Sequence, residues 1–311
     1  MSSPDPVLRR VAVVANPTSG RHRAGVLGLE LGRELRARGH EVLDVRAADG
    51  PGALARLRPL AVGGELDAVV AIGGDGTAHW VANACAGTSA AVLIVAAGTG
   101  NDNATTLGMP RVRTPADLPA VVQRLTAGRT ASMDLGRVTH PTGDRHWLGV
   151  LGAGFDTVVN ARGRRLTLLN GTPRYLAAVA AELPRFSGIP YAVTVDGQRI
   201  DTEAMLVAVA NGGAFGGGMR VCPDASVTDG LFDVLILHKI SRLEFLTVFP
   251  RVFSGTHVRH PQVQVLRGRQ VRLDAPDLAA EADGEELFAL PLDLRIDPGA
   301  LRVATGDAEL P

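Results

Sequence analysis

Two glycine-rich turns contain the residues of this chain that are best suited to chemistry. The segment GGDGT at 73–77 follows the apolar run AVVAI, and GTGND at 98–102 follows AVLIVAA. Apolar runs of this length that end at glycine are typical of buried parallel strands, and α/β proteins bind their ligands where such strands end. Glycine lets backbone N–H groups close on an anion, and the residues that follow can open a helix. The two turns together predict a nucleotide-phosphate site.

The alternative for either turn alone is an ordinary tight turn, because a single GGDG segment is not specific for a ligand. Two loops of this kind, each with an aspartate and a threonine, favour the site instead. Asp75 and Asp102 stand beside glycine or in a turn and not inside an apolar run. Both are therefore candidate catalytic carboxylates.

Lysine usage restricts how the chain could handle phosphate. Lys239 is the only lysine, so arginine supplies the other 31 of the 32 lysine and arginine residues. P-loop enzymes need the lysine of GK[ST], protein kinases need a strand lysine and Schiff-base enzymes need a lysine nucleophile, but Lys239 lies in LILHKISRL, outside these motifs. These classes are excluded, which leaves backbone amides, arginine and metal to bind phosphate.

The composition is that of an ordinary globular protein of 311 residues, with 46% hydrophobic and 21% charged residues. The formal net charge of +0 gives no support to nucleic-acid binding. Cys85 and Cys222 are too few for a disulfide framework or a structural zinc site, and we expect them to be reduced. The amino-terminal apolar stretch VAVVA is too short for a signal peptide or a membrane span, so a cytoplasmic protein is expected.

The first half of the chain alternates strand-like and helix-like segments, which is the rhythm of a parallel, doubly wound α/β sheet. The expected strands are VLRRVAVVA, EVLDVRA, DAVVAIGG and AVLIVAAG. The expected helices cover 22–38, 52–61, 77–86 and the segment that begins at Thr114-Pro115. Gly39 is a favoured helix stop, and Pro115 is a favoured first helical residue.

From about Met133 the rhythm changes to strands that favour antiparallel pairing. YAVTVDGQRI and AMLVAVAN predict a hairpin around Asp196-Gly197, and LFDVLILH, VQVLRG, QVRLDA and LPLDLRID predict further strands. Helical patterns cover 173–183 and 242–253. We therefore expect an α/β domain over 1–132 and an antiparallel β-sandwich domain over 133–311.

Five segments together resemble a known superfamily. NPTSGR, GGDGT, GTGNDNA, GGGMRVCPDASVTDGLFDV and EADGEE occur in the order and spacing of the diacylglycerol kinase catalytic-domain superfamily, and the chain is similar to its bacterial lipid kinase branch. The resemblance covers about residues 11 to 305, although GGDGT alone is shared with NAD kinases. It implies a kinase that uses ATP and Mg²⁺, with its active site between an NAD kinase-like α/β domain and a β-sandwich.

Carried onto this chain, the resemblance implies roles for individual residues. It implies an ATP site made of Asn16, Pro17, Thr18, Ser19, Gly20, Gly73, Gly74, Asp75, Gly76, Thr77, Ala78 and His79, with Thr99 beside the phosphates. It implies a magnesium site made of Ser226, Asp229 and the backbone carbonyl of Leu231. Glu285 matches the general base, and Asp102 matches a residue that bridges nucleotide and acceptor.

These roles suit phosphoryl transfer, which needs metal and hydrogen-bond donors around the γ-phosphate and a carboxylate near the attacking hydroxyl. Two residues also have a purely structural interpretation. Asp229-Gly230 before a strand is a common hairpin turn, and Glu285 is equally consistent with a solvated turn residue. The chain also departs from the family where His79-Trp80 replaces the usual Asn-Glu, which removes a carboxylate from the nucleotide loop.

Two arginine-rich stretches bear on the acceptor. Four arginines and no acid lie between Asp156 and Glu182, and five arginines lie between Glu244 and Asp274. Such stretches favour anionic lipid headgroups and peripheral contact with the inner face of the membrane, or else form a solvated face or pair between the two domains. We expect phosphate transfer to a lipid hydroxyl, with diacylglycerol the leading acceptor and no nucleic-acid partner. An NAD kinase, a nucleotide-binding regulator without catalysis and a homodimer stay open.

Overall fold

The computed structural model describes residues 8–17, 19–20, 23–45, 49–98, 100–166, 172–306 and 309–311. It divides into two compact units: unit 1 is Met1–Leu135 with Pro298–Pro311, and unit 2 is Gly136–Asp297. The boundary expected from the sequence lies at residue 132; in the structure the C-terminal segment returns to unit 1.

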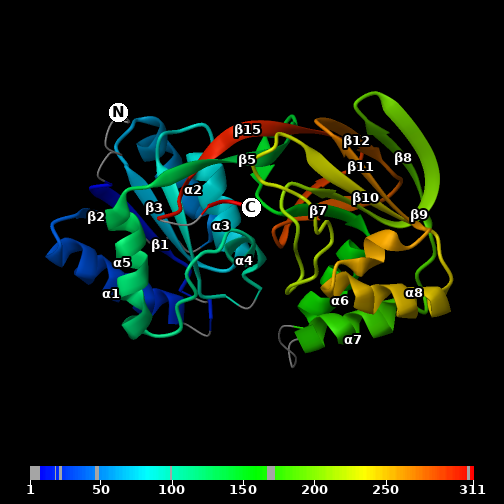
Figure 1. Ribbon diagram of the computed structural model, residues 1–311, viewed down its shortest axis with the longest axis horizontal. Coiled ribbons are helices and arrows are strands. Elements are labelled where there is room, and N and C mark those ends of the chain that lie inside the picture. Colours follow the sequence, from blue (N-terminus) through cyan, green and yellow to red (C-terminus); the bar gives the residue numbers. More distant parts are fainter. Residues whose placement is uncertain are drawn as a thin grey trace. The chain divides into compact units, whose positions relative to one another are not determined.

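Unit 1 is a parallel sheet with helices between its strands, as predicted (Figure 1). Its order is β2, β1, β3, β4, followed by the end of β15, where Arg302 pairs with Ala91. Strands β3 and β4 are buried at every position, as expected for parallel strands covered on both faces. The strands are β1 (Arg10–Ala15), β2 (Glu41–Val45), β3 (Ala68–Gly73), β4 (Ala91–Ala96) and the shared β5 (Thr130–Val138) and β15 (Leu292–Ala304).

The helices of unit 1 form two groups, because α1 contacts α5 and α2 contacts α3. The Asp49 carboxylate caps α2 by accepting the N–H of Gly52 at 2.8 Å, and the predicted start at Thr114-Pro115 is a capping box with Asp117. The helices are α1 (Arg23–Ala37), α2 (Gly50–Val62), α3 (Asp75–Cys85), α4 (Asp102–Thr106), the 3₁₀ turn η1 (Pro115–Asp117) and α5 (Leu118–Ala127).

Unit 2 is antiparallel, which confirms the predicted β-sandwich. The long strand β9 pairs with β7, β8 and β10, and the predicted Asp196-Gly197 turn joins β8 to β9 with positive φ at both residues. The strands are β6 (Arg145–Trp147), β7 (Val150–Gly154), β8 (Ile189–Val195), β9 (Gln198–Ala210), β10 (Phe232–His238), β11 (Val263–Gly268), β12 (Gln270–Asp274), β13 (Ala279–Ala282) and β14 (Glu285–Ala289).

Two apolar clusters hold unit 2 together. One fills the sandwich, where the rings of Trp147 and Phe232 stack 5.4 Å apart, and the other lies around Phe155 and Phe245 under the helices. The helix α6 is absent from the expected elements, and the expected helix 242–253 is divided into α8 and η2, where Pro250 lacks a backbone N–H. These elements are α6 (Phe155–Arg165), α7 (Thr172–Glu182), α8 (Arg242–Val248), η2 (Phe249–Phe253) and η3 (Thr256–Arg259).

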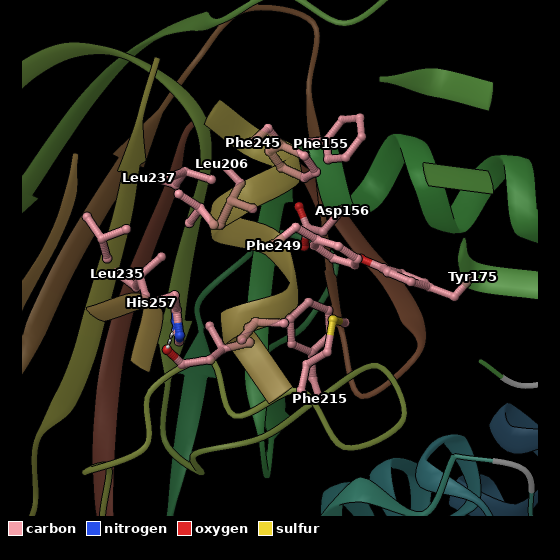
Figure 2. Close-up of a pocket in the computed structure, with 15 residues that line it drawn as sticks. Phe155, Asp156, Tyr175, Leu206, Phe215, Leu235, Leu237, Phe245, Phe249 and His257 are labelled. Atoms are coloured by element: carbon pink, nitrogen blue, oxygen red, sulfur yellow. Dashed lines mark hydrogen bonds between the residues drawn. The ribbon is translucent and has the colours of Figure 1, made fainter. Parts of the chain in front are cut away.

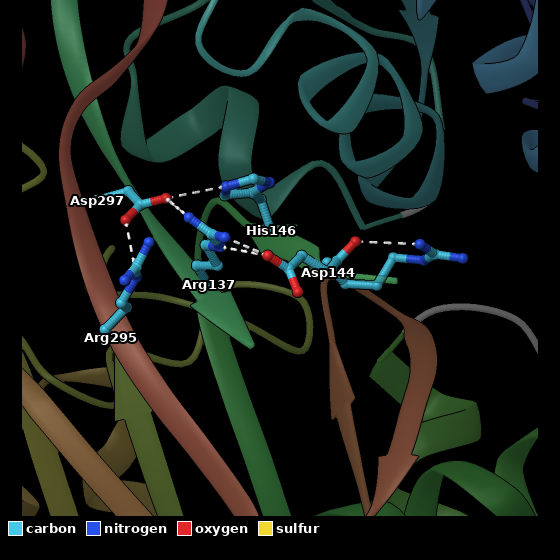
Figure 3. A network of polar contacts seen from close by, with 6 residues as sticks. Arg137, Asp144, His146, Arg295 and Asp297 are labelled. Carbon is cyan, nitrogen blue, oxygen red and sulfur yellow. Dashed lines mark hydrogen bonds and ion pairs between the residues drawn. The ribbon is translucent and has the colours of Figure 1, made fainter. Parts of the chain in front are cut away.

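Strands β5 and β15 both run from one unit into the other. On the unit 2 side of that boundary, Arg137 on β5 forms ion pairs with Asp144 and with Asp297 on β15, the latter at 3.3 Å (Figure 3). His146 lies 3.2 Å from the same Asp297 carboxylate. The ion pairs therefore join the two connecting strands where they enter unit 2.

Candidate functional site

The two predicted glycine-rich loops contact each other at one edge of the unit 1 sheet. The backbone N–H of Asn103 donates to Asp75 Oδ1 at 2.9 Å, and the N–H groups of Ala97 and Gly98 donate to the Gly73 carbonyl at 2.9 and 3.0 Å. The Asn101 side chain closes the second loop by bonding both the N–H and the carbonyl of Gly98. Long-range backbone and side-chain bonds thus fix these loops against each other.

Steric crowding explains why glycine occupies several positions at this contact. A Cβ placed on Gly98 would lie 2.5 Å from the Gly74 Cα, so no other residue fits there without moving the backbone. A Cβ on Gly100 would lie 2.7 Å from an Asp75 carboxylate oxygen, and one on Gly20 would overlap the Ala97 carbonyl. Three loops, after β1, β3 and β4, therefore approach one another at backbone distance.

The helix α3 begins directly at this contact. Gly74 is its N-cap with no side-chain cap, and Asp75 is in its first turn. The N–H groups at the start of a helix have no partner within the helix and create a positive end that favours anions. This edge of unit 1 therefore has the chemistry of a phosphate site, with the carboxylates of Asp75 and the mostly buried Asp102 beside it.

The other predicted nucleotide residues lie on the same loops where the structure describes them. The N–H of Asn16 donates to the Ile72 carbonyl at 3.3 Å, and the N–H of Ser19 donates to the Asn16 carbonyl at 3.1 Å. Pro17, Gly20, Gly76, Thr77 and Ala78 accompany them, whereas Thr18 and Thr99 lie outside the described residues.

His79 differs from its neighbours because its side chain is fully buried. Its ring contacts the Trp80 ring edge-on at 5.3 Å, and the Asn83 side chain donates to the His79 backbone carbonyl. The Trp80 indole covers Gly50 at the start of α2, where a Cβ would overlap it. The pair His79-Trp80 therefore packs α3 against α2.

The predicted metal residues share one turn of unit 2, before β10. The Leu231 N–H donates to Asp229 Oδ1 at 3.0 Å, and the hydroxyls of Ser226 and Thr228 lie 3.2 Å apart. The Asp229 carboxylate also pairs with Arg267, whose Nε lies 3.6 Å from Asp233 Oδ1.

Asp233 is a buried carboxylate behind this turn. Burial raises its pKa above the usual value, and the charge of Arg267 opposes this shift. Its Oδ2 atom is buried with no hydrogen-bond partner among the residues that the structure describes. No three His, Cys, Asp or Glu side chains in the described ranges are placed to hold a metal. A cation bound here would therefore depend on hydroxyl and carbonyl oxygens as well as on Asp229.

The EADGEE segment forms the hairpin β13–β14, with Asp283 and Gly284 at the turn and both at positive φ. The Asp283 carboxylate accepts the N–H groups of Leu148 and Gly149 at 2.9 and 3.0 Å, so the turn is fixed against the start of β7. Glu285 is the first residue of β14, pairs with Ala282 and is partly exposed. Its position is thereby defined by a rigid hairpin.

Unit 2 also contains an apolar cavity that the sequence analysis does not identify (Figure 2). It holds about 60 Å³ between the sheet and the helices α6, α7 and α8, and it is partly open to solvent. The rings of Phe155, Phe215, Phe245 and Phe249 and aliphatic side chains line most of it. Such a lining favours an apolar ligand.

Asp156 is the one acidic residue in the lining of this cavity. Its Oδ1 atom is buried without a hydrogen-bond partner in the described part of the chain. Burial, and secondarily the negative charge of Glu281, raise the pKa of the Asp156 carboxyl to about 7. A carboxyl that titrates near neutrality inside an apolar cavity is a candidate for ligand recognition.

Glu281 connects the hairpin to α6. Its carboxylate accepts the Asn160 side-chain N–H at 2.9 Å and forms an ion pair with Arg164 at 2.7 Å. Glu281 pairs with Gly152 across β13 and β7, and a Cβ on Gly152 would overlap the Asp156 carboxylate. The segment GFD at 154–156 puts an acid directly after an apolar residue, and this local pattern could have pointed to Asp156. The position of Glu281 relative to Asp156 depends on the register of β13 and β7, which a local pattern does not show.

Several arginines of the two arginine-rich stretches are paired within unit 2. Arg162 pairs with Glu182 at 2.5 Å, Arg164 with Glu281 at 2.7 Å and Arg272 with Asp293 at 2.6 Å. These arginines are therefore paired with acids of their own unit, and the pairs are not ones between the two domains. Among the described residues, no helix has the length and apolar character needed to cross a membrane.

Comparison with known families gives one match in the N-terminal part of the chain and another in the C-terminal part. Residues 10–138 match the diacylglycerol kinase catalytic domain, and residues 149–305 match the YegS C-terminal NAD kinase beta sandwich-like domain. A diacylglycerol kinase of Mycobacterium tuberculosis is 34% identical over 296 residues, which cover 94% of each chain. A diacylglycerol kinase of Bacillus subtilis is 26% identical and covers 91% of this chain and 92% of its own.

Solved structures show the same fold. A diacylglycerol kinase from Bacillus anthracis str. Sterne superposes with a TM-score of 0.69 at 18% identity over 96% of this chain and 97% of its own. An NAD kinase from Archaeoglobus fulgidus in complex with ATP superposes with a TM-score of 0.57 at 14% identity over 96% of this chain and 94% of its own. Both likenesses are of fold alone.

Proposed function

Because the chain belongs to the diacylglycerol kinase family of lipid kinases, we propose that it phosphorylates diacylglycerol at the expense of ATP. The free hydroxyl of the acceptor attacks the γ-phosphorus, the bond between that phosphorus and the β–γ bridging oxygen breaks, and the hydroxyl proton passes to a carboxylate. The products are phosphatidic acid and ADP. Family membership makes the enzyme a lipid kinase, and we propose ATP as its phosphate donor and diacylglycerol as its acceptor.

The contact between the two glycine-rich loops supports ATP as phosphate donor. The α3 N-terminus offers backbone N–H groups, and Gly98 and Gly74 keep both loops free of side chains where they meet. A chain with a single lysine must use backbone amides, arginine or metal to neutralise a triphosphate, and the α3 N-terminus supplies the amides. Asp75 and Asp102 begin the helices α3 and α4 at this edge. We assign Asp102 to orienting nucleotide and acceptor, and Asp75 to fixing the loops and the charge beside the phosphates.

Glu285 is our candidate for the general base. A base must reach the acceptor hydroxyl and keep its orientation through the reaction. Glu285 begins a strand whose preceding turn is fixed by the Asp283 carboxylate, and it is partly exposed, so both requirements can be met. Its role in this chain would be to accept the proton as the hydroxyl attacks.

The turn from Ser226 to Leu231 suits Mg²⁺ in the chemistry of its donors, which are a hydroxyl, a carboxylate and a carbonyl. The buried, unpartnered Oδ2 of Asp233 adds an uncompensated oxygen near Asp229 among the described residues. Ser226, Asp229 and the carbonyl of Leu231 would hold the ion, in competition with Arg267 for Asp229. A Mg²⁺ ion held there would add positive charge to this turn.

The apolar cavity of unit 2 is the observation that carries the choice of a lipid acceptor. The polar groups of NAD and of sugars need hydrogen-bond partners, whereas the described lining here is mostly aromatic and aliphatic, with Asp156 as its one carboxyl and His257 as its one imidazole. Acyl chains gain free energy from such burial in proportion to the apolar area removed from water. A lipid acceptor would require peripheral contact of the enzyme with a membrane.

Acceptor assays test the proposal. Purified protein with Mg²⁺ and labelled ATP is offered diacylglycerol, monoacylglycerol, sphingosine, ceramide and NAD in turn. Phosphatidic acid as the main product supports the proposal, and label found in NAD alone would overturn it. ATP binding without any phosphorylated product would instead favour a regulator.

The variant Glu285→Gln checks the proposed base, with Glu286→Gln as its matched control on the next, exposed residue of β14. We expect Glu285→Gln to lose about 100-fold or more of turnover while retaining ATP affinity. Full turnover in this variant would remove Glu285 from the reaction.

A further inference from the structure

The segment 242–253 has apolar side chains on both of its faces. Phe245, Val248, Phe249 and Val252 line the cavity, and Figure 2 shows Phe245 and Phe249 directed into it. The residues between them form a second apolar stripe, the outer face, made of Leu243, Leu246, Pro250 and Phe253. The spacing of three, four and three positions puts these four on one side of the segment.

The outer face is among the most exposed apolar surface of the chain. Leu243 is 78% exposed, Leu246 is 57% exposed and Phe253 is 38% exposed. A second apolar face on a helical segment, apart from the face that packs on its own unit, is normally covered by another protein or by a membrane. An exposed apolar stripe therefore marks a contact surface.

The charges beside the stripe identify what covers it. Arg242, Arg251 and Arg259 are exposed on the segment 241–262, where the only acid is Glu244. His260 lies 3.5 Å from the Glu244 carboxylate, so this acid has a neighbour that offsets its charge when protonated. Apolar side chains flanked by arginines are the pattern of segments that lie in the interface of an anionic bilayer. A second copy of the chain would instead add more positive charge than negative charge to this surface.

A chain of aromatic contacts connects the outer face to the cavity. The exposed ring of Phe253 meets Phe249 edge-on at 6.1 Å, and Phe249 stacks on Phe245 at 5.5 Å. Phe245 in turn meets Phe155 at 5.2 Å. The same short segment is thus both the wall of the cavity and the exposed stripe.

We infer that the outer face of α8 and η2 binds the surface of an anionic phospholipid bilayer, with Leu243, Leu246 and Phe253 inserted among the acyl chains and Arg242 and Arg251 on the headgroups. The inference rests on the proposed function, since it locates the surface from which a lipid acceptor reaches the cavity. It adds a docking surface that is separate from the loops and from the cavity lining.

Vesicle binding tests the inference. The wild type, Leu243→Gln/Leu246→Gln and Arg242→Gln/Arg251→Gln are sedimented with vesicles of phosphatidylcholine, pure or mixed in equal parts with phosphatidylglycerol. Val26→Gln/Leu29→Gln is the matched control, because these α1 residues have the same spacing and are 56% and 43% exposed. We expect the leucine pair to lower partition onto mixed vesicles by about tenfold or more, the control to bind as the wild type does, and the arginine pair to remove the preference for phosphatidylglycerol.

Activity on diacylglycerol dispersed in detergent micelles separates this inference from the proposed function. The leucine pair should keep wild-type turnover there and lose it on vesicles. A wild type that is inactive in micelles contradicts the proposed function, whereas active protein that binds vesicles equally well with and without the leucines overturns the docking surface. The docking surface is also overturned if the wild type does not bind mixed vesicles. It is overturned as well if sedimentation velocity shows that the only effect of the leucine substitutions is to convert a dimer to a monomer.

Discussion

The carboxylate of Asp75 accepts the backbone N–H of Asn103 at 2.9 Å, so one side chain joins the loop after β3 to the loop after β4. The two residues are 28 positions apart, and the Gly73 carbonyl, which accepts the N–H groups of Ala97 and Gly98, adds a second link between the loops. The loop that bears the α3 N-terminus is therefore positioned by an acid and not by a basic residue. Asp75 therefore has a structural role, which is to hold the two loops together, in addition to any effect of its negative charge.

Substitution of Asp75 separates these two roles. Asp75→Asn keeps an oxygen that can accept the Asn103 N–H, whereas Asp75→Ala removes it; we expect losses of unfolding free energy of about 0.5 and about 2 kcal/mol, respectively. Urea denaturation measures both. If charge beside the phosphates matters, both variants lose turnover by about tenfold or more, but only Asp75→Ala also loses stability. Wild-type turnover in Asp75→Asn would leave Asp75 with the structural role alone.

Gly98→Ala tests the close approach of the loops. The added Cβ would lie 2.5 Å from the Gly74 Cα, a clash that no rotamer relieves, so the two loops must separate. We expect ATP affinity to fall by about tenfold or more and the unfolding free energy by about 1–3 kcal/mol. Nucleotide titration by calorimetry measures the first effect and urea denaturation the second.

Gly163→Ala is the control for Gly98→Ala. Gly163 lies inside α6, and a Cβ there meets no atom within 4 Å in the described structure. Alanine should therefore stabilise this helix by about 0.5–1 kcal/mol and leave ATP affinity unchanged. Equal ATP affinity in Gly98→Ala and the wild type would contradict the importance of the loop contact.

The loops could be predicted from the sequence because their signals are local. Each apolar run leads straight into its glycines, and the resulting turns lie on adjacent strands, β3 and β4. The Asp196-Gly197 hairpin and the capped start at Thr114 are local for the same reason. Short-range patterns of this kind need no knowledge of strand register.

The cavity could not be predicted in the same way. Asp156 and Glu281 meet only because β13 pairs with β7 in the register that puts Glu281 opposite Gly152. The helix α6 begins directly after β7 at Gly154, whose φ of 139° makes the turn without a separate loop, and its polar sequence FDTVVNARGRR shows little apolar periodicity. His79, which the family resemblance assigns to the ATP site, has a fully buried side chain whose ring contacts Trp80, and this burial could not be predicted from the sequence.

Asp156 makes the stability of the fold depend on pH. Its pKa is about 7 in the folded protein, whereas an aspartate in the unfolded chain releases its proton near pH 4. Between these values the folded state holds a proton that the unfolded state does not, so the unfolding free energy falls as the pH rises from about 4 to about 7. Asp156→Asn removes this loss. The unfolding free energy of Asp156→Asn minus that of the wild type should therefore be about 1–3 kcal/mol greater at pH 8 than at pH 5.

Urea denaturation at pH 5 and pH 8 measures this difference. Asp201→Asn is the control, because Asp201 is exposed and its pKa is lowered by its hydrogen bond with Arg199, so no gain in relative stability is expected above pH 5. Parallel pH profiles for the wild type and Asp156→Asn would show that the Asp156 carboxyl titrates near its ordinary value in the folded protein.

Arg267 determines how available Asp229 is to a cation. The guanidinium pairs with Asp229 and lies 3.6 Å from Asp233, so an ion that binds Asp229 competes with a positive charge already there. Given the proposed magnesium site, we expect Arg267→Gln to lower the Mg²⁺ concentration for half-maximal turnover by about threefold or more and Asp229→Asn to raise it by about tenfold. Initial rates measured against Mg²⁺ at saturating ATP give both values. If both variants raise the requirement, Arg267 supports the turn and does not compete with the metal; if neither changes it, the turn does not bind the ion that the reaction uses.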